Sequence, residues 1–150
     1  MSQDLQNLYR QVVLEHNRNP RNFGKLEEYT HHAEGNNPLC GDRVELFLQI
    51  EHNKVCHVGF EGEGCAICNA SSSLLTEAIQ GQSLEQVHQL HQRFEHMLSG
   101  EQTPNEEELG PLLVFAGLVD FPARLKCATL AWKALQAALE RAEAPVSTES

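Results

Sequence analysis

RVELFLQIEHNKVCHVGFEG, residues 43–62, has the alternating pattern of a β-hairpin. Its first half carries an apolar side chain at every second position, and such alternation predicts a strand with one buried face. These apolar positions are Val44, Leu46, Leu48 and Ile50. A short polar stretch predicts the turn, and residues 55–62 predict the antiparallel partner strand. In that second strand we expect Cys56, Val58 and Phe60 to share the buried face, which would make Cys56 a core residue.

An amphipathic helix is predicted before the hairpin, from Leu5, because the apolar residues of LQNLYRQVVLEHNR recur at helical spacing. Pro20 and Gly24 end this pattern. Residues 25–36 are polar and predict at most a short edge strand near residues 28–32. The N-terminal part of the chain is therefore expected to contribute one helix and one edge strand.

Helices are predicted for the remainder of the chain. The first begins at the glycine-rich turn that follows the hairpin and ends at Gly81. Ser83 is expected to cap the next helix, because Gln86 occupies the capping-box position. A short helix opened by a run of glutamates and reaching Phe115 follows, and then a long, mostly apolar helix from Pro122.

The order of these elements predicts an α+β fold, in which helices pack on one face of a small antiparallel sheet of about three strands. A chain of 150 residues without a linker or an internal repeat is expected to form a single domain over residues 1–150. We expect only the ends, residues 1–3 and 143–150, to be flexible. No large apolar stripe is left over for self-association, so we expect a monomer.

Charge and composition exclude several classes of partner. The formal net charge is −10, and an acidic chain without a basic cluster is expected to bind no nucleic acid and no anionic membrane surface. No apolar run reaches the length of a membrane span, and the N-terminus lacks the pattern of a secretory signal. We therefore expect a cytoplasmic protein whose thiols are kept reduced.

Three of the five cysteines lie at the boundaries of predicted elements. Cys40 is on the turn before the first hairpin strand, Cys65 is on the turn after the second, and Cys127 is inside the last helix. Because a hairpin returns the chain to its start, Cys65 can lie close to Cys40 and Asp42. Three thiolates and a carboxylate suit tetrahedral zinc or iron–sulfur chemistry. The residues alone leave open whether Cys127 joins them.

Two other patterns of cysteine and histidine allow different interpretations. Cys65 and Cys68 form a CxxC pair, which at a helix N-terminus is typical of a redox-active dithiol. The βαβ context that such a pair needs is missing from this sequence. His88, His91 and His96 are interpreted as a solvated helix face rather than as a second metal site.

Three longer segments resemble a known family. They are NPLCGD (residues 37–42), GEGCAICNASSSLLTEAIQGQS (residues 62–83) and FPARLKCATLAWKAL (residues 121–135). In content and order they are similar to the signature segments of the U-type iron–sulfur cluster assembly family, the IscU, NifU N-terminal and SufU group, and the likeness covers residues 4–142. The resemblance implies a SufE/NifU-like fold. The metal ligands that it implies are Cys40, Asp42, Cys65 and Cys127.

Within this family the chain is most similar to the SufU branch. Arg124 and Lys126 precede Cys127, whereas scaffold members usually carry a histidine directly before this cysteine. The stretch between Gly81 and Pro122 is also longer than in the scaffold members. The resemblance implies a Zn²⁺-dependent sulfurtransferase, which takes persulfide sulfur from a pyridoxal-phosphate-dependent, SufS-like cysteine desulfurase and passes it toward downstream iron–sulfur assembly proteins.

The resemblance also implies a role for each site residue. Cys40, on a loop beside Gly41, is the expected sulfur acceptor once a side chain of the desulfurase displaces it from zinc. Arg124 is an accessory residue expected to contact a thiolate or the partner, and Cys68 is either a small residue on the first helical turn or an alternate ligand. Three other functions stay open, namely a scaffold for a transient [2Fe–2S] cluster, a CxxC thiol oxidoreductase and a structural zinc domain.

Overall fold

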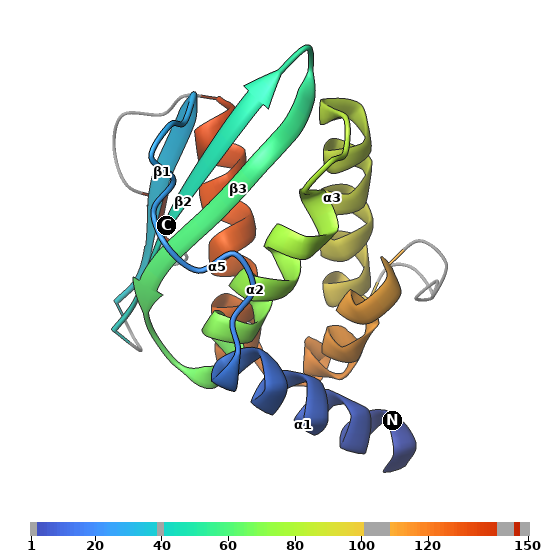
Figure 1. Ribbon diagram of the computed structural model, residues 1–150. Coiled ribbons are helices and arrows are strands. Elements are labelled where there is room, and N and C mark those ends of the chain that lie inside the picture. Colours follow the sequence, from blue (N-terminus) through green and yellow to red (C-terminus); the bar gives the residue numbers. More distant parts are fainter. Residues whose placement is uncertain (1–2, 39–40, 101–108, 141–145, 148–150) are drawn as a thin grey trace.

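The computed structural model describes residues 3–38, 41–100, 109–140 and 146–147. The helices are α1 (Gln3–Arg18), α2 (Ala66–Ile79), α3 (Leu84–Ser99), the 3₁₀ helix η1 (Gly110–Asp120) and α5 (Pro122–Leu139). The strands are β1 (His31–Asn37), β2 (Asp42–Glu51), β3 (Lys54–Glu63) and β4 (Val146–Ser147). Together they form one sheet and a layer of helices, and α1 crosses one end of the molecule (Figure 1).

The sheet has the strand order β3-β2-β1-β4. Its three long strands run antiparallel, whereas β4 pairs in parallel with β1. Figure 1 shows α2 and α5 on one face of this sheet, so the predicted α+β fold is confirmed. The first strand differs from the edge strand expected near residues 28–32, because it begins at His31 and continues to Asn37, opposite Asp42. With β4 beside it, β1 is an interior strand.

The second hairpin strand departs from strict alternation, and the prediction that Cys56 lies in the core is wrong. Gln49 of β2 pairs with His57 of β3. The next residue of β2, Ile50, pairs with Val55, so Cys56 stands between the two pairs as the extra residue of a β-bulge. The bulge moves Cys56 off the buried face, where it is only half-buried, and Val55 takes the core position instead.

Helix α5 packs closely against β1. Ala134, which has no exposed surface, lies at this contact. The strand contributes Gly35, where a Cβ would lie 3.0 Å from Leu130 Cδ1 and 3.4 Å from the Leu130 backbone oxygen. Since there is little room for a side chain between them, the backbones of strand and helix approach each other closely. This approach brings the first half of α5 beside the end of β1.

Helix boundaries largely follow the signals in the sequence. Ser83 caps α3, and the reciprocal hydrogen bonds of a capping box join it to Gln86, which confirms that prediction. Pro122 is the first residue of α5, also as expected. The short helix predicted before it is the 3₁₀ helix η1, which extends past Phe115. The glutamates that were expected to open it lie in residues 101–108, outside the described part of the chain.

A buried histidine joins α1 to α2. His16 is 7% exposed, and its Nδ1 lies 2.7 Å from Ser73 Oγ. Ser73 Oγ also accepts the backbone N–H of Arg21 at 2.8 Å, and its hydroxyl proton is available to donate to a neutral His16 ring. Only a neutral imidazole accepts a hydrogen bond on a ring nitrogen. Burial, reinforced by the charge of Arg21, lowers the pKa of His16 and so maintains this neutral form.

Protonation of His16 is therefore expected to destabilise the fold. The unfolded chain binds this proton near the ordinary histidine pKa of about 6.5, whereas the folded chain binds it only at lower pH. Between these two values the unfolded state carries more protons, so the free energy of unfolding falls as the pH decreases. Urea denaturation at about pH 7.5 and about pH 5.5 measures this loss.

A pair of variants isolates the contribution of His16. His16→Gln should lower the free energy of unfolding at the higher pH and should also reduce the loss on acidification. His57→Gln, at an exposed position of β3, is the matched control and should keep the wild-type loss. An equal acid-dependent loss in both variants would contradict the assignment of this effect to His16.

Candidate metal centre

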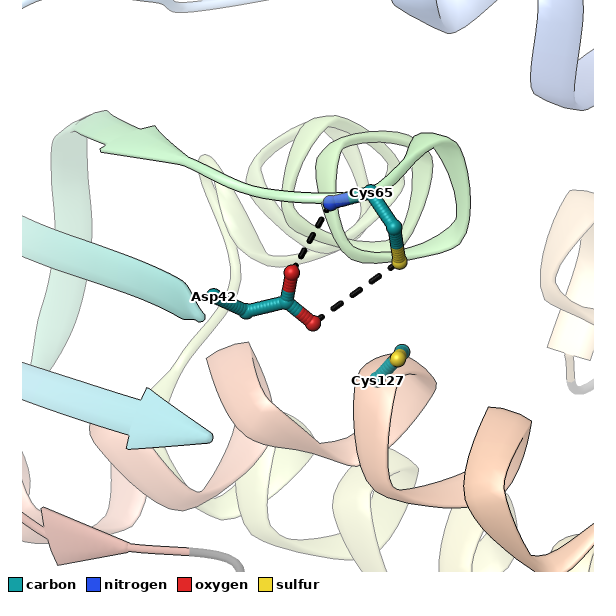
Figure 2. Close-up of side chains that lie close together, drawn as sticks. All are labelled: Asp42, Cys65 and Cys127. Carbon is teal, nitrogen blue, oxygen red and sulfur yellow. Dashed lines mark hydrogen bonds between the residues drawn. The ribbon is translucent and has the colours of Figure 1, made fainter. Parts of the chain in front are cut away.

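Three of the predicted site residues come together from three separate elements. Asp42 is the first residue of β2, Cys65 directly precedes α2, and Cys127 lies in the second turn of α5. One carboxylate oxygen and two sulfur atoms from this group all lie within 4.8 Å of one another. Figure 2 shows the three side chains directed toward a common space. The hairpin thus returns the chain to its start, and α5 closes the group from the other side.

The Asp42 carboxylate fixes the beginning of α2. Asp42 is 2% exposed, its Oδ1 accepts the backbone N–H of Cys65 at 2.9 Å, and its Oδ2 accepts the Cys65 S–H at 3.7 Å (Figure 2). Gly64 leaves room for these contacts, because a Cβ at that position would lie 2.8 Å from Asp42 Oδ1. Asp42 is therefore placed to bind a cation and to hold Cys65 beside it.

Cys65 is the N-cap of α2, and its sulfur accepts the backbone N–H of Cys68 at 3.4 Å. A helix N-terminus stabilises negative charge, so this position favours a thiolate. Cys68 is 2% exposed and packs in the hydrophobic core, and no disulfide joins it to Cys65. Among the described residues, the metal-ligand group contains Cys65 but does not extend to Cys68.

Cys127 is 4% exposed and lies deepest among the sulfur ligands of the described group. Its S–H donates to the backbone oxygen of Ala123 at 3.6 Å, and its sulfur accepts a hydrogen bond from Asn37 Nδ2 at 3.8 Å. Burial above all, and then the neighbouring Cys65 and Asp42 side chains, raise the pKa of the Cys127 thiol. Each of these influences disfavours further negative charge, and a bound cation would reverse them.

The donor set fits a zinc ion. Two sulfurs on one tetrahedral zinc lie about 3.8 Å apart, because each Zn–S bond is about 2.3 Å long. The group of Asp42, Cys65 and Cys127, with all ligand atoms within 4.8 Å, has this size. Three ligands leave one position of a tetrahedron, and the remaining predicted ligand, Cys40, lies outside the described residues. The residue after it, Gly41, has φ +71°, a conformation that glycine adopts without strain.

Arg124, predicted as an accessory residue, is not brought into the ligand group. It lies one turn before Cys127 but is exposed, and its guanidinium carbon stands 4.9 Å from the centre of the Phe121 ring. Together with Tyr9 it lines a groove formed by α1, η1 and the start of α5. Burial raises the pKa of Tyr9, and the positive charge of Arg124 opposes this shift. Arg124 therefore belongs to the surface that borders the centre.

Asn37 contacts the Cys127 sulfur, and the sequence patterns had not indicated this residue as part of the site. It is 1% exposed and follows Ala33 and Gly35 on the buried face of β1. The period-two pattern of a strand would have shown a polar side chain at a core position. That signal depends on the strand boundaries, and the edge strand was predicted too early in the chain.

The comparison with protein families agrees with this arrangement of residues. The family model described as the NifU-like N-terminal domain matches residues 8–128. The chain belongs to this family. The matched range contains Asp42, Cys65 and Cys127, and it confirms the family predicted from the three signature segments.

Curated relatives in this iron–sulfur cluster assembly family align with nearly the whole chain. The zinc-dependent sulfurtransferase SufU from Bacillus subtilis is 41% identical over 140 residues, which are 93% of this chain and 95% of that relative. The iron–sulfur cluster assembly scaffold protein IscU from Streptococcus pyogenes is 39% identical over 137 residues, which are 91% of this chain and 86% of that relative. Proteins with two different named activities thus resemble the chain to a similar degree.

Solved structures share the fold. The crystal structure of FiSufU from Fervidobacterium islandicum AW-1 superimposes with a TM-score of 0.82 at 33% identity and covers 89% of this chain and 98% of that one. The N-terminal part of a NifU-like protein from Brucella abortus has the same TM-score of 0.82 at 23% identity, over 93% of this chain and 96% of that one. The expected NifU-like fold is therefore confirmed. None of the described helices combines the length and the apolar character needed to cross a membrane.

Gly64→Ala is expected to weaken metal binding by displacing the Asp42 carboxylate. The added Cβ would lie 2.8 Å from Asp42 Oδ1, so the carboxylate must move and its hydrogen bond to Cys65 is disturbed. We expect the zinc affinity to fall about tenfold or more, as is usual when a group that orients a ligand is altered. Competition with a chromophoric chelator measures the affinity. Glu63→Ala, at an exposed neighbouring position, is the matched control, and equal affinities of the two variants would exclude this role of Gly64.

Proposed function

We propose that this chain is a zinc-dependent sulfur acceptor and transfer protein in iron–sulfur cluster assembly. The observation that carries the proposal is the group of Asp42, Cys65 and Cys127, whose ligand atoms lie within 4.8 Å of one another. The 41% identity to Bacillus subtilis SufU over 93% of this chain supports the sulfur-transfer assignment. Arg124 and Lys126, the SufU-like residues before Cys127, support it as well.

In this proposal zinc is held by Cys40, Asp42, Cys65 and Cys127. When bound, zinc keeps the cysteine sulfurs deprotonated at neutral pH. Asp42 orients Cys65 through its hydrogen bonds to the backbone N–H and the side chain of that residue. The rigid start of α2 therefore presents one sulfur of the site, and α5 presents another.

Cys40 receives the sulfur. Its thiolate attacks the terminal sulfur of the persulfide on the desulfurase, and a new S–S bond forms on Cys40 while the S–S bond of the desulfurase breaks. The desulfurase cysteine leaves as a thiolate, and Cys40 becomes the persulfide. Charge and electrons balance, so the step consumes no oxidant and no reductant.

The positions of the other two sulfurs support Cys40 as the acceptor. Cys127 is 4% exposed inside α5, and Cys65 is tied to Asp42 at the start of α2. Cys40 precedes Asp42 by two residues, and two residues span at most about 7 Å, which keeps Cys40 within reach of the centre. The adjacent Gly41 has φ +71°, a conformation that glycine adopts without strain, and in this proposal it lets the chain present Cys40 to the partner.

The sulfur donor in this proposal is a pyridoxal-phosphate-dependent cysteine desulfurase of the SufS type. The recipients are other proteins of iron–sulfur cluster assembly. Arg124 is exposed next to Phe121, one turn before Cys127, where it is available to contact the desulfurase. We place these reactions in the cytoplasm, because they require thiols that are kept reduced.

A scaffold for a transient [2Fe–2S] cluster is the second candidate function. The 39% identity to the scaffold protein IscU of Streptococcus pyogenes favours it, and three thiolates with one carboxylate are also suited to a cluster. The two functions differ under anaerobic reconstitution with iron and sulfide. A scaffold forms a coloured cluster, whereas a zinc-dependent acceptor keeps its zinc and accelerates the desulfurase.

Metal analysis of the purified chain, combined with a cysteine desulfurase turnover assay, tests the first candidate. We expect tightly bound zinc and a turnover rate that rises when the chain is added. Cys40→Ala should reduce the rate to that of the desulfurase alone, because the acceptor thiol is missing. Cys56→Ala, on the bulge of β3, is the matched control and should keep the full stimulation. Absence of bound metal, or wild-type sulfur uptake by Cys40→Ala, would refute the proposal.

A further inference from the structure

The packing of the fold does not explain why an asparagine stands at position 37. It is 1% exposed at the end of β1. The preceding residues on the same face, Ala33 and Gly35, are small and carry no polar side chain. A polar side chain at the next such position lowers stability unless its polar atoms find partners in the interior.

Only part of this requirement is met. Asn37 Nδ2 donates a hydrogen bond to Cys127 Sγ at 3.8 Å. Asn37 Oδ1 has no hydrogen-bond partner within the ranges of the chain that the structure describes. A buried acceptor of this kind makes the fold less stable than an apolar side chain of the same shape would. The amide therefore has a stability cost, and its contact is with the sulfur of a proposed metal ligand.

The donor and the acceptor of this hydrogen bond both stand on rigid elements. Asn37 pairs with Asp42 in the register of β1 and β2. β1 in turn lies against α5, where a Cβ on Gly35 would come within 3.0 Å of Leu130 Cδ1. Strand pairing and helix packing therefore fix the amide relative to Asp42 and Cys127.

We infer that Asn37 is a positioning residue of the centre, whose amide holds the Cys127 sulfur in a ligating orientation and makes it less reactive toward the desulfurase persulfide. A hydrogen bond to a thiolate sulfur withdraws electron density, and such bonds tune metal–sulfur sites. Cys127 stays a ligand for this reason while Cys40 accepts sulfur. The inference rests on the proposed function. It makes Asn37 the residue that keeps Cys127 a metal ligand, in contrast to Cys40, which accepts the sulfur.

Asn37→Leu separates this role from a purely structural one. Leucine has a similar shape but lacks both amide atoms, so it removes the unpaired Oδ1 together with the hydrogen bond to Cys127. The metal-free variant should be at least as resistant to urea as the wild type. Its zinc dissociation constant, measured by competition with a chromophoric chelator, should rise about 10- to 100-fold, the usual effect of removing a group that orients a ligand.

Two further measurements report on the Cys127 sulfur itself. With Co²⁺ in place of zinc, the sulfur-to-cobalt charge-transfer band should move to lower energy in Asn37→Leu, because a sulfur without the hydrogen bond donates electrons more readily. In the zinc-bound chain, iodoacetamide should alkylate Cys127 faster in this variant, as followed by peptide mass, because a thiolate without the hydrogen bond is the stronger nucleophile. Asn36→Leu is the matched control on the opposite face of β1 and should behave like the wild type.

If leucine disrupts folding, each measurement is repeated on Asn37→Ser, whose side chain is too short to reach the Cys127 sulfur. Wild-type zinc affinity, cobalt spectrum and Cys127 alkylation in both Asn37 variants would overturn the inference and leave the proposed function intact. A wild-type chain that binds no metal would overturn the proposed function instead. In that case the inference falls with it, because Asn37 is assigned to the orientation of a metal ligand.

Discussion

The hydrogen bonds of the Asp42 carboxylate join the start of β2 to the start of α2, and the arrangement of sheet, helices and ligand group depends on this junction. A buried carboxylate is costly unless it is paired. Asp42 finds its partner in the Cys65 backbone N–H at 2.9 Å. Together with the hydrogen bond from the Cys65 S–H to Oδ2, this contact pairs the carboxylate, closes the open end of the hairpin and sets the residue at which α2 begins. Gly64 permits it by leaving the carboxylate its space.

The second constraint is the packing of α5 across β1, which brings Cys127 to the group formed by Asp42 and Cys65. These three residues come from β2, from the position before α2 and from α5. A bound ion would therefore connect the sheet to the helices and would not be confined to a single loop. Metal binding and folding are therefore coupled, since an ion that binds only the folded chain stabilises every element that supplies a ligand.

Local patterns in the sequence predicted the parts of the structure that local forces determine. The alternation of β2 and the capping box of Ser83 act over a few residues, and both are present. Cys56 was misplaced because a bulge adds one residue without changing the apolar content of a strand. The hairpin alone predicted Cys65 near Asp42, whereas the place of Cys127 came from the family resemblance. The contact of Asn37 depends on packing between β1 and α5, which no local pattern encodes.

The close contact between α5 and β1 has a consequence for the spacing of the donor atoms. At Gly35 a Cβ would lie 3.0 Å from Leu130 Cδ1 and 3.5 Å from Ala134 Cβ, so the position has no room for a larger side chain. The same helix carries Cys127, and the same strand pairs with β2 at Asp42. Residues that touch no ligand thus help to set the distance between two donor atoms, and a methyl group added at Gly35 would change that distance while every donor atom stayed the same.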